Sequence, residues 1–235
     1  MANSRFLLVD LIIPAYNEEG SIARVVEEVP RGLVRDILVC DNASTDATAA
    51  RARAAGATVV PAPRRGYGSA CLAGLAHVGA RPRAEWPEAV AFLDGDLSDF
   101  PAQLDRVLAP IARGEADLVI GSRALGRREG GAMLPHQVFG NWLATTLIRL
   151  RWGVRFTDLG PFRAVRYGAL RELGMADPDF GWTVEMQVKA AKRGLRSVEV
   201  PVDYRNRAAG RSKVSGSLRN SYLAGQKILF TIFTN

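Results

Sequence analysis

Two aspartates separated by one glycine, Asp94 and Asp96, follow an apolar segment, residues 89–93, that we expect to form a buried strand. Carboxylates spaced in this way at the end of a strand can bind one hard divalent cation, and that cation can hold the two phosphates of a nucleoside diphosphate. The alternative is a tight turn, because Asp-Gly is favoured in turns and Asp96 can cap a following helix. The pair alone is compatible with both interpretations.

Two further polar segments follow the first and second apolar strands. Residues 14–18 (Pro-Ala-Tyr-Asn-Glu) offer an aromatic face, an amide and a carboxylate, and residues 41–46 (Asp-Asn-Ala-Ser-Thr-Asp) can surround a base or a ribose with donors and acceptors. Each segment alone could be a turn or a helix cap, but the three together favour a nucleotide site. The chain has no G-x-x-x-x-G-K-[ST] motif and no G-x-G-x-x-G after its first strand, which argues against a phosphate-loop or dinucleotide-binding protein.

Apolar strands alternate with amphipathic helices through the first half of the chain. We expect strands over residues 7–13, 37–40, 57–60, 89–93 and 118–121, and helices over residues 21–29, 47–55, 68–78 and 101–113. This alternation predicts an α/β fold with a mainly parallel central sheet flanked by helices, because parallel strands need crossover connections. Ligands bind outside the carboxyl ends of such strands, and the three polar segments all fall at that edge.

The second half has a different pattern. We expect helices over residues 135–152, 167–173, 183–193 and 216–233, and a half-exposed strand near a sheet edge over residues 198–204. The first of these helices carries an apolar side made of Phe139, Trp142, Leu143, Leu147 and Leu150. Alternation of valines with polar residues predicts the exposed strand, since neighbouring side chains point to opposite faces of a sheet.

Length and composition favour one folded domain of 235 residues, with 48% hydrophobic and 23% charged residues and no segment that resembles a linker. We expect neither a signal peptide nor a membrane-spanning helix, because the apolar run over residues 6–13 is short and interrupted by Asp10. The chain is therefore expected to stay in the cytoplasm. Cys40 and Cys71 are too few for a disulfide framework or a zinc site, and we interpret them as small core residues.

The net charge of +7 is unevenly distributed. Residues 189–227 contain ten Lys and Arg against Glu199 and Asp203, a local charge of +8. Such a segment suggests an anionic partner, either a phosphate-bearing substrate, a lipid surface or a nucleic acid, although solvated surface charge would also account for part of it. A nucleic-acid partner is not expected, because no RNA-binding or helix-turn-helix pattern accompanies these residues.

An ordered set of short motifs extends over residues 9–227. It consists of residues 13–19, 39–46, 65–68, 94–96, 121–123, 157–158, 160–163 and 210–213, together with Glu185, Gly194 and Arg207. With these motifs the chain resembles the GT-A glycosyltransferases of family 2, and within them the dolichyl-phosphate mannose and polyprenyl-phosphate sugar synthases. The resemblance implies one GT-A domain over residues 1–235, in which residues 1–123 bind the nucleotide sugar and residues 124–235 form the acceptor side.

The resemblance also implies residue roles in an inverting hexosyl transfer from a GDP- or UDP-hexose. The donor-binding residues would be Pro14, Ala15, Tyr16, Glu18, Asp41, Asn42, Arg65, Asp94 and Gly95. Asp94 and Asp96 would bind Mg²⁺ or Mn²⁺ on the diphosphate. Arg207, Ser212 and Lys213 would contact phosphate, although they could instead be solvated surface charges.

The need for a base depends on the acceptor. A sugar hydroxyl needs a carboxylate to take its proton, and Glu185 and Asp158 are the candidates. A polyprenyl phosphate is already ionised and needs none, in which case Arg123 and Arg163 would hold its phosphate. Glu185 could also be a structural partner of nearby basic residues. A transferase with a hydroxyl acceptor and a nucleotide-sugar-binding protein without turnover are the alternatives to a polyprenyl-phosphate transferase.

Several positions depart from the family pattern. Ser98 stands where the family often has an amide that serves as a third metal ligand, and Asp99 replaces a frequent His. Asn42 and Tyr67 stand where Asp and Lys are common. The membrane-spanning helices of some relatives are not expected either, because residues 223–233 are too short to cross a bilayer.

A peripheral membrane contact is one interpretation of the C-terminal part. The basic segment and residues 228–233 could lie on an anionic membrane at the cytoplasmic face, with Trp142 and Trp152 as interface anchors. The alternative is that this last helix packs on its own sheet. The sequence leaves the oligomeric state open.

Overall fold

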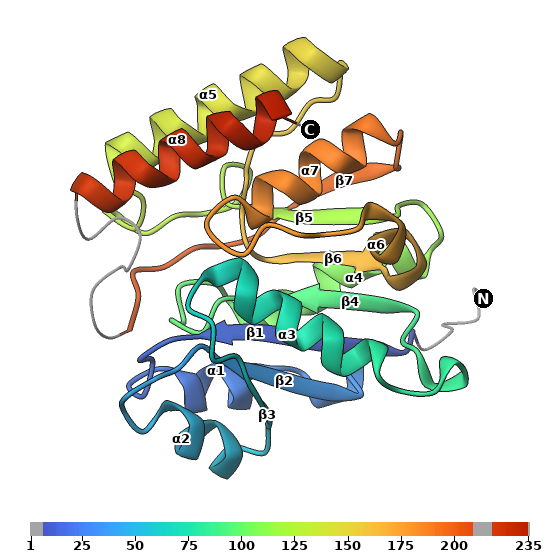
Figure 1. Cartoon of the computed structure of the whole chain (residues 1–235), viewed down its shortest axis with the longest axis vertical. Coiled ribbons are helices and arrows are strands. Elements are labelled where there is room, and N and C mark those ends of the chain that lie inside the picture. Colours follow the sequence, from blue (N-terminus) through green and yellow to red (C-terminus); the bar gives the residue numbers. More distant parts are fainter. Residues whose placement is uncertain (1–6, 209–217, 235) are drawn as a thin grey trace.

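A seven-stranded sheet with helices on both faces forms the centre of the computed structural model, which describes residues 7–208 and 218–234 (Figure 1). The strands are β1 (Val9–Ala15), β2 (Asp36–Asp41), β3 (Thr58–Pro61), β4 (Ala89–Phe92), β5 (Leu118–Ser122), β6 (Arg163–Arg166) and β7 (Ser197–Pro201). They lie in the order β3-β2-β1-β4-β6-β5-β7, and only β6 is antiparallel to its neighbours. The predicted α/β fold with a mainly parallel sheet is confirmed.

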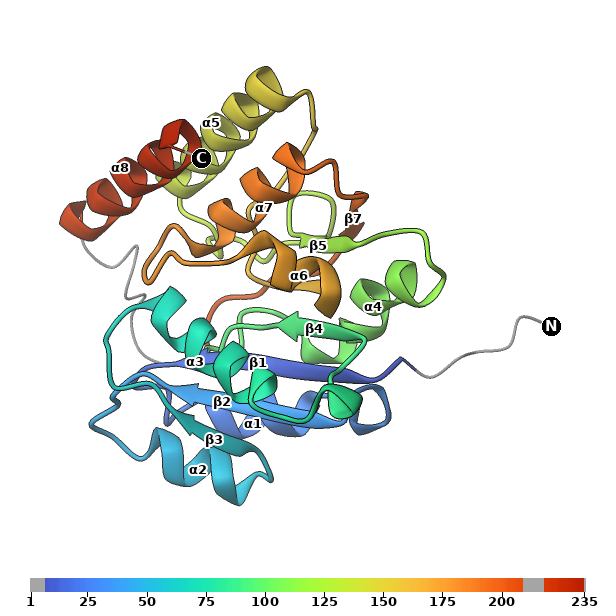
Figure 2. The ribbon, with the colours of Figure 1, turned by 45° about the vertical axis from the view of Figure 1, so that its right-hand side comes forward.

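The helices are α1 (Ile22–Glu28), α2 (Thr48–Ala54), α3 (Tyr67–Gly79), α4 (Leu104–Ala112), α5 (Pro135–Trp152), α6 (Tyr167–Leu173), α7 (Trp182–Lys192) and α8 (Leu218–Thr234). Helices α1, α2 and α4 cover one face of the sheet, and α3, α6 and α7 cover the other. Helices α5 and α8 lie side by side outside α7, at the end of the molecule farthest from α2 (Figure 2).

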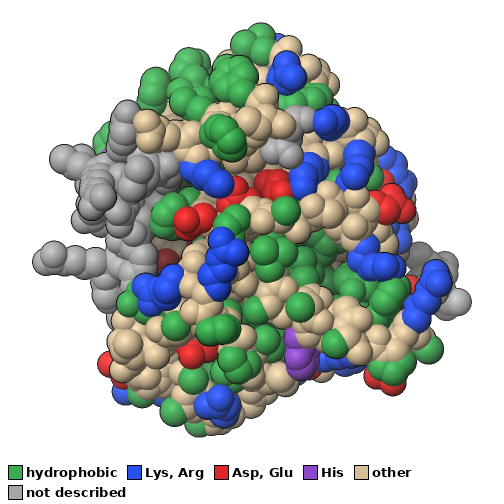
Figure 3. Space-filling model, in the orientation of Figure 1, with side chains coloured by type: hydrophobic (Ala, Val, Ile, Leu, Met, Phe, Trp, Pro, Cys, Tyr) green, Lys and Arg blue, Asp and Glu red, His purple; other side chains and the backbone are tan. Residues whose placement is uncertain are grey.

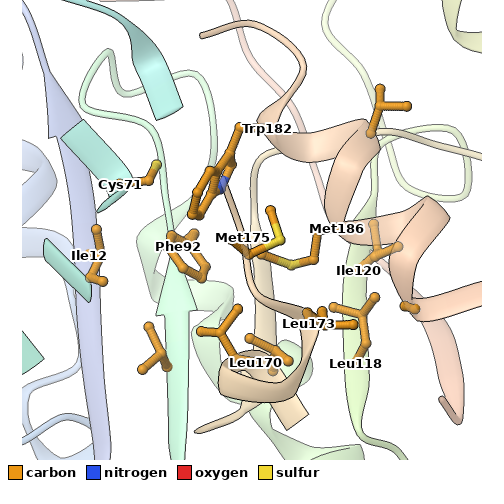
Figure 4. Packing of buried hydrophobic residues seen from close by; sticks show 14 of the residues in the cluster. Ile12, Cys71, Phe92, Leu118, Ile120, Leu170, Leu173, Met175, Trp182 and Met186 are labelled. Carbon is orange, nitrogen blue, oxygen red and sulfur yellow. The ribbon is translucent and has the colours of Figure 1, made fainter. Parts of the chain in front are cut away.

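Alternation along the strands supplies one hydrophobic core on each face of the sheet. In β1, Ile12 packs under α3, whereas Leu11 and Ile13 belong to the core beneath α1 and α4. Phe92 of β4 meets Trp182 of α7 edge to face, with 5.9 Å between ring centroids (Figure 4). Burying side chains of this size stabilises the fold by about 1.5–3 kcal/mol each. Packing of Phe92 against Trp182 therefore holds the end of β4 in place.

The structure differs from the predicted elements in the second half of the chain. Strand β6 was not predicted, because its segment is short and reads as irregular. Helix α5 has the predicted bounds, but its inward side is Ala144, Thr145 and Ile148, and much of the predicted apolar side faces solvent. The edge strand is confirmed as β7. Among the described residues no helix is both long and apolar enough to cross a bilayer.

The carboxyl ends of β1, β2 and β4 meet at one edge, since Ala15 pairs with Asp41 and Ile12 pairs with Phe92. Each of the three loops that follow contains one non-glycine residue with positive φ, namely Asn17 (50°), Ala43 (57°) and Leu97 (64°). They are the only such residues in the described part of the chain. Side chains other than glycine rarely adopt this backbone conformation, and it concentrates where function requires a particular loop shape.

Candidate functional site

A cavity of about 360 Å³ opens at this edge of the sheet. It is lined by Pro14, Ala15, Tyr16, Glu18, Asn42, Arg65, Gly66, Tyr67, Ala70, Asp94, Gly95, Asp96, Asp179, Phe180 and Arg207. Most of the predicted donor-binding residues therefore come together, although they derive from four separate segments of the chain. The volume suits a small-molecule ligand.

On one wall of the cavity an arginine side chain stacks over a tyrosine ring. The Arg65 guanidinium lies 3.1 Å from the centroid of the Tyr16 ring. Asn42 shapes this wall instead of presenting a free amide, because its Nδ2 donates to the carbonyls of Ala62 (3.0 Å) and Arg64 (2.6 Å) and its Oδ1 accepts from the amide of Gly66 (2.8 Å). A stacked Tyr-Arg pair beside a rigid loop is suited to a planar ring such as a nucleobase.

Asp41 lies next to this wall but does not line the cavity. Its Oδ1 accepts from the amide of Ser44 at 3.3 Å, and the side chain is half-buried. The predicted nucleoside contact of Asp41 stays a prediction.

The two aspartates that follow β4 are oriented by hydroxyl groups. Tyr67 donates to Asp94 Oδ1 at 3.0 Å, and Ser98 donates to Asp96 Oδ1 through its amide (2.9 Å) and its hydroxyl (2.5 Å). Burial and the neighbouring charge of Asp96 raise the pKa of Asp94 to about 7. The two carboxylates repel each other in a partly desolvated cavity, and a bound cation would relieve this repulsion.

The donor set at this position fits a hard divalent cation, because all of it is oxygen. Protein side chains alone do not complete a metal site. In residues 7–208 and 218–234 no three or more His, Cys, Asp or Glu side chains lie close enough together to hold a metal ion. The Ser98 hydroxyl donates to Asp96, so in this structure it orients that carboxylate. A cation held by Asp94 and Asp96 would take its remaining ligands from a bound diphosphate and water.

Arg207 enters the cavity because the residues on both sides of it are hydrogen-bonded to the aspartate loop. The amide of Arg205 donates to the carbonyl of Ser98 (2.9 Å), and the amide of Ala208 donates to the carbonyl of Asp96 (3.2 Å). The Arg207 guanidinium lies 2.7 Å from Glu18 Oε1 and 3.7 Å from Asp96 Oδ2. The positively charged Arg207 guanidinium thus lies beside Glu18 and Asp96, where it can bind phosphate oxygens.

Two residues predicted with Arg207, Ser212 and Lys213, lie outside the described residues. Their phosphate contacts stay predictions.

The loop between α6 and α7 closes the other side of the cavity and contributes Asp179 and Phe180, which the sequence analysis did not identify. The carbonyl of Pro178 accepts from the amide (2.8 Å) and the hydroxyl (3.1 Å) of Ser69 at the start of α3. Gly68 is required at this contact, because a Cβ there would collide with the backbone of Asp177. No local pattern identified this loop, since its position depends on the packing of α7.

Glu185 holds the same loop from behind. Its carboxylate accepts from the amides of Ala176 (3.0 Å) and Asp177 (2.9 Å) and pairs with Lys189 at 2.7 Å. The side chain is buried and does not line the cavity of about 360 Å³. This geometry gives Glu185 a positioning role, and the predicted role as a base is not supported by it.

Asp158 and Arg123 form a second buried pair outside the cavity lining. Arg123 donates to both carboxylate oxygens of Asp158, at 2.7 and 2.8 Å, and its amide donates to Oδ2 at 2.8 Å. Burial opposes ionisation of Asp158, but the Arg123 charge and these hydrogen bonds outweigh it and hold its pKa below the usual value. A carboxylate of low pKa in a bidentate pair is a poor proton acceptor.

Arg163 is fully buried, contrary to its predicted contact with an acceptor phosphate. Its guanidinium donates to the carbonyls of Gly160 (3.0 Å) and Thr183 (2.9 Å) and to Gln187 Oε1 (3.3 Å). Burial lowers its pKa to about 10. Because its donors are directed at backbone carbonyls, Arg163 fastens the loop before β6 to α7, and this arrangement does not support the phosphate contact.

Asp99, the other departure in the aspartate loop, is buried, and neither of its carboxylate oxygens has a hydrogen-bond partner among the described residues. Burial and the nearby Asp94 charge raise its pKa well above the usual value. The raised pKa favours the neutral form of the side chain, which is less costly to bury than the charged form.

Comparison with known proteins gives a consistent result. Residues 10–174 match the family described as Glycosyl transferase family 2. An uncharacterized glycosyltransferase of Mycobacterium tuberculosis is 39% identical over 217 residues, which cover 92% of this chain and 94% of that protein. The undecaprenyl-phosphate mannosyltransferase of Micrococcus luteus is 34% identical over 224 residues, which cover 88% and 87% of the two chains.

A solved structure shares the fold. Glucosyl-3-phosphoglycerate synthase from Mycobacterium tuberculosis, in complex with Mn²⁺, UDP-glucose and phosphoglyceric acid, superposes with a TM-score of 0.72 and 25% sequence identity. The similarity covers 97% of this chain and 79% of that chain.

Proposed function

The chain belongs to glycosyl transferase family 2 and is a glycosyltransferase with the GT-A fold, and from this premise we propose that it transfers a hexose from a nucleoside-diphosphate sugar to a polyprenyl phosphate. In this reaction the bond between the sugar C1 and the diphosphate oxygen breaks, and an acceptor phosphate oxygen bonds to C1 from the opposite side. Residues 1–123 supply most of the donor site, Asp179, Phe180 and Arg207 of the second half complete it, and the rest of residues 124–235 forms the acceptor side, at the cytoplasmic face of a membrane.

The donor cavity supports the first part of this proposal. Tyr16 and Arg65 stack on the nucleobase, and Arg207 neutralises diphosphate charge from the opposite wall. Asp94 and Asp96 would hold Mg²⁺ or Mn²⁺, which would supply Lewis-acid stabilisation of the departing diphosphate. A solved relative of the same fold binds Mn²⁺ and UDP-glucose. Tyr67 and Ser98 fix the two carboxylates, so that their orientation is set before the ligand arrives.

The single observation that favours a phosphate acceptor is that both predicted bases, Asp158 and Glu185, are already held in ion pairs and hydrogen bonds within the protein. Asp158 is paired with Arg123, and Glu185 is bonded to backbone amides and to Lys189, so neither carboxylate can readily accept a proton at the donor cavity. A phosphate acceptor needs no base, because it is already ionised at neutral pH. The named activity of the undecaprenyl-phosphate mannosyltransferase supports the same acceptor class.

A second function is favoured by one residue. Asp179 is an exposed carboxylate among the residues that line the cavity, and a carboxylate in this position can act as a base on a hydroxyl acceptor. The alternative activity is therefore transfer to a sugar or other hydroxyl, with Asp179 as the general base.

The variant Asp179→Asn separates the two functions. With a phosphate acceptor we expect kcat to stay within about threefold of the wild-type value, because no proton has to be removed. If Asp179 is a base, kcat falls by roughly 10²–10⁴-fold. Transfer is measured with GDP-mannose and UDP-glucose as donors and with undecaprenyl phosphate or a panel of soluble sugars as acceptors. Absence of lipid product with every polyprenyl phosphate, together with a soluble product that depends on Asp179, contradicts the proposal.

A further inference from the structure

Helices α5 and α8 present a row of large apolar side chains to solvent. On α5 the exposed fractions are 60% for Phe139, 58% for Trp142 and 77% for Leu150, and on α8 they are 62% for Phe230 and 63% for Phe233. Figure 3 shows the hydrophobic side chains gathered over α5 at the top of the molecule. Exposed aromatic residues concentrated on two neighbouring helices mark an interaction surface, whereas single exposed apolar residues do not.

The inner sides of the two helices are already occupied. Ala144 and Ile148 of α5 and Ile232 of α8 are buried in the core above α7. The exposed row is therefore a second apolar side and not the usual core-facing stripe of an amphipathic helix. Trp152, predicted as an interface anchor with Trp142, is half-buried against the core and does not belong to this row.

The charge of the two helices indicates the partner. Neither α5 nor α8 contains Asp or Glu, whereas α5 carries Arg149 and Arg151, both exposed. Apolar side chains bordered by basic ones match a membrane surface, where aromatic rings lie among the headgroups and basic residues meet anionic lipids. A second copy of the chain is a poorer match, because each copy would bring basic residues and no carboxylate from these helices.

The surface is also connected to the donor cavity. Lys227 of α8 pairs with Asp177 at 3.0 Å, and Asp177 lies in the loop that contributes Asp179 and Phe180 to the cavity. The exposed row and the donor cavity are thus joined through one loop. An enzyme that takes its acceptor from a bilayer needs this proximity between its lipid-facing surface and its site.

We propose that the outer sides of α5 and α8 form a lipid-docking surface, in which Phe139, Trp142, Phe230 and Phe233 enter the headgroup region of an anionic bilayer. This inference deepens the proposed function, on which it rests for the choice of a lipid partner. Its test does not need turnover, so its failure is distinguishable from failure of the proposed acceptor.

Flotation with vesicles tests the surface directly. Wild-type protein and the variant Phe139→Ser/Trp142→Ser are floated with vesicles of phosphatidylglycerol and phosphatidylcholine, and with vesicles of phosphatidylcholine alone. We expect the wild type to bind the anionic vesicles better than the neutral ones. Each ring removed should weaken binding by roughly tenfold, since burying an apolar side chain of this size shifts an equilibrium by about that factor. Leu8→Ser, an exposed apolar position outside both helices, is the matched control and should bind as the wild type does.

Three outcomes overturn the proposal. One is absence of wild-type binding to both kinds of vesicle, and another is equal binding of the double variant. The third is a wild-type dimer in sedimentation experiments that the double variant loses while vesicle binding is unchanged, which assigns the surface to a second copy. The control for folding is thermal unfolding. We expect the double variant to unfold at the same midpoint temperature as the wild type, because both substituted side chains are more than half exposed. If the wild type binds vesicles but glycosylates no polyprenyl phosphate, the surface stands and the acceptor assignment fails.

Discussion

Substitution of Glu185 separates a positioning role from a catalytic one. In Glu185→Ala the amides of Ala176 and Asp177 lose their acceptor, and Lys189 loses a partner at 2.7 Å. Breaking a buried ion pair by removing one member costs about 3–5 kcal/mol. In Glu185→Gln one carbonyl oxygen still accepts a hydrogen bond, so we expect a smaller loss of about 1–3 kcal/mol.

The same change should reach the donor cavity through the loop that Glu185 holds. Because this loop contributes Asp179 and Phe180 to the cavity lining, its displacement weakens donor binding. We expect the KM for the nucleotide sugar to rise by roughly tenfold in Glu185→Gln, which corresponds to about 1.4 kcal/mol. Loss of kcat should be smaller than this rise in KM.

Urea unfolding and the pH dependence of turnover measure these effects. Glu27→Gln, an exposed position on α1, is the matched control and should change neither stability nor KM. The reasoning is refuted if Glu185→Gln keeps the wild-type stability and KM but loses roughly 10²-fold or more in kcat together with the basic limb of the pH profile. That result is the signature of a general base.

Three further predictions concern the cavity and the buried Arg123–Asp158 pair. Gly68→Ala should raise the donor KM and lower stability, because its Cβ collides with the loop that closes the cavity, whereas Gly79→Ala at the end of the same helix should do neither in the same assays. Arg123→Gln should cost about 3–5 kcal/mol in urea unfolding at pH 7. Because the pKa of Asp158 is lower in the folded than in the unfolded protein, its ionisation stabilises the fold at pH values above the unfolded pKa. This stabilisation is lost as the pH falls through the folded pKa. Without Arg123 it is reduced, so acid unfolding of Arg123→Gln, followed by far-UV circular dichroism, should begin at a higher pH than that of the wild type. Tyr16→Ala should weaken nucleoside diphosphate binding in calorimetry by roughly 5- to 150-fold, the value of one stacking contact of about 1–3 kcal/mol; an unchanged affinity would show that the base binds elsewhere.

The first half of the fold could be predicted because its strands are continuous apolar runs separated by helices of clear periodicity. The same pattern placed Tyr16, Asp94 and Asp96 at one edge of the sheet, since parallel strands share their carboxyl edge. The second half was harder for a physical reason. Strand β6 is only four residues long, and the exposed side of α5 carries large apolar residues, Phe139, Trp142 and Leu150, of the kind that usually face a core.

Roles that depend on side-chain pairing could not be predicted from residue type. Arg163 and Glu185 have the chemistry of a phosphate ligand and a base, but burial and packing direct them at backbone groups. Asp179 and Phe180 reach the cavity only because α7 packs against β4 through Trp182. No local motif contains that information.

Calorimetric titration of the protein with UDP and with GDP, in Mn²⁺ and in EDTA, tests the central claim most directly. The account predicts that one nucleoside diphosphate binds in Mn²⁺, that binding is at least tenfold weaker in EDTA, equivalent to about 1.4 kcal/mol, and that Asp96→Ala removes this dependence on the cation. Asp105→Ala, an exposed aspartate of α4, should bind as the wild type does. Equal affinity in Mn²⁺ and EDTA, or a cation dependence that survives Asp96→Ala, would contradict the metal-assisted nucleotide-sugar site.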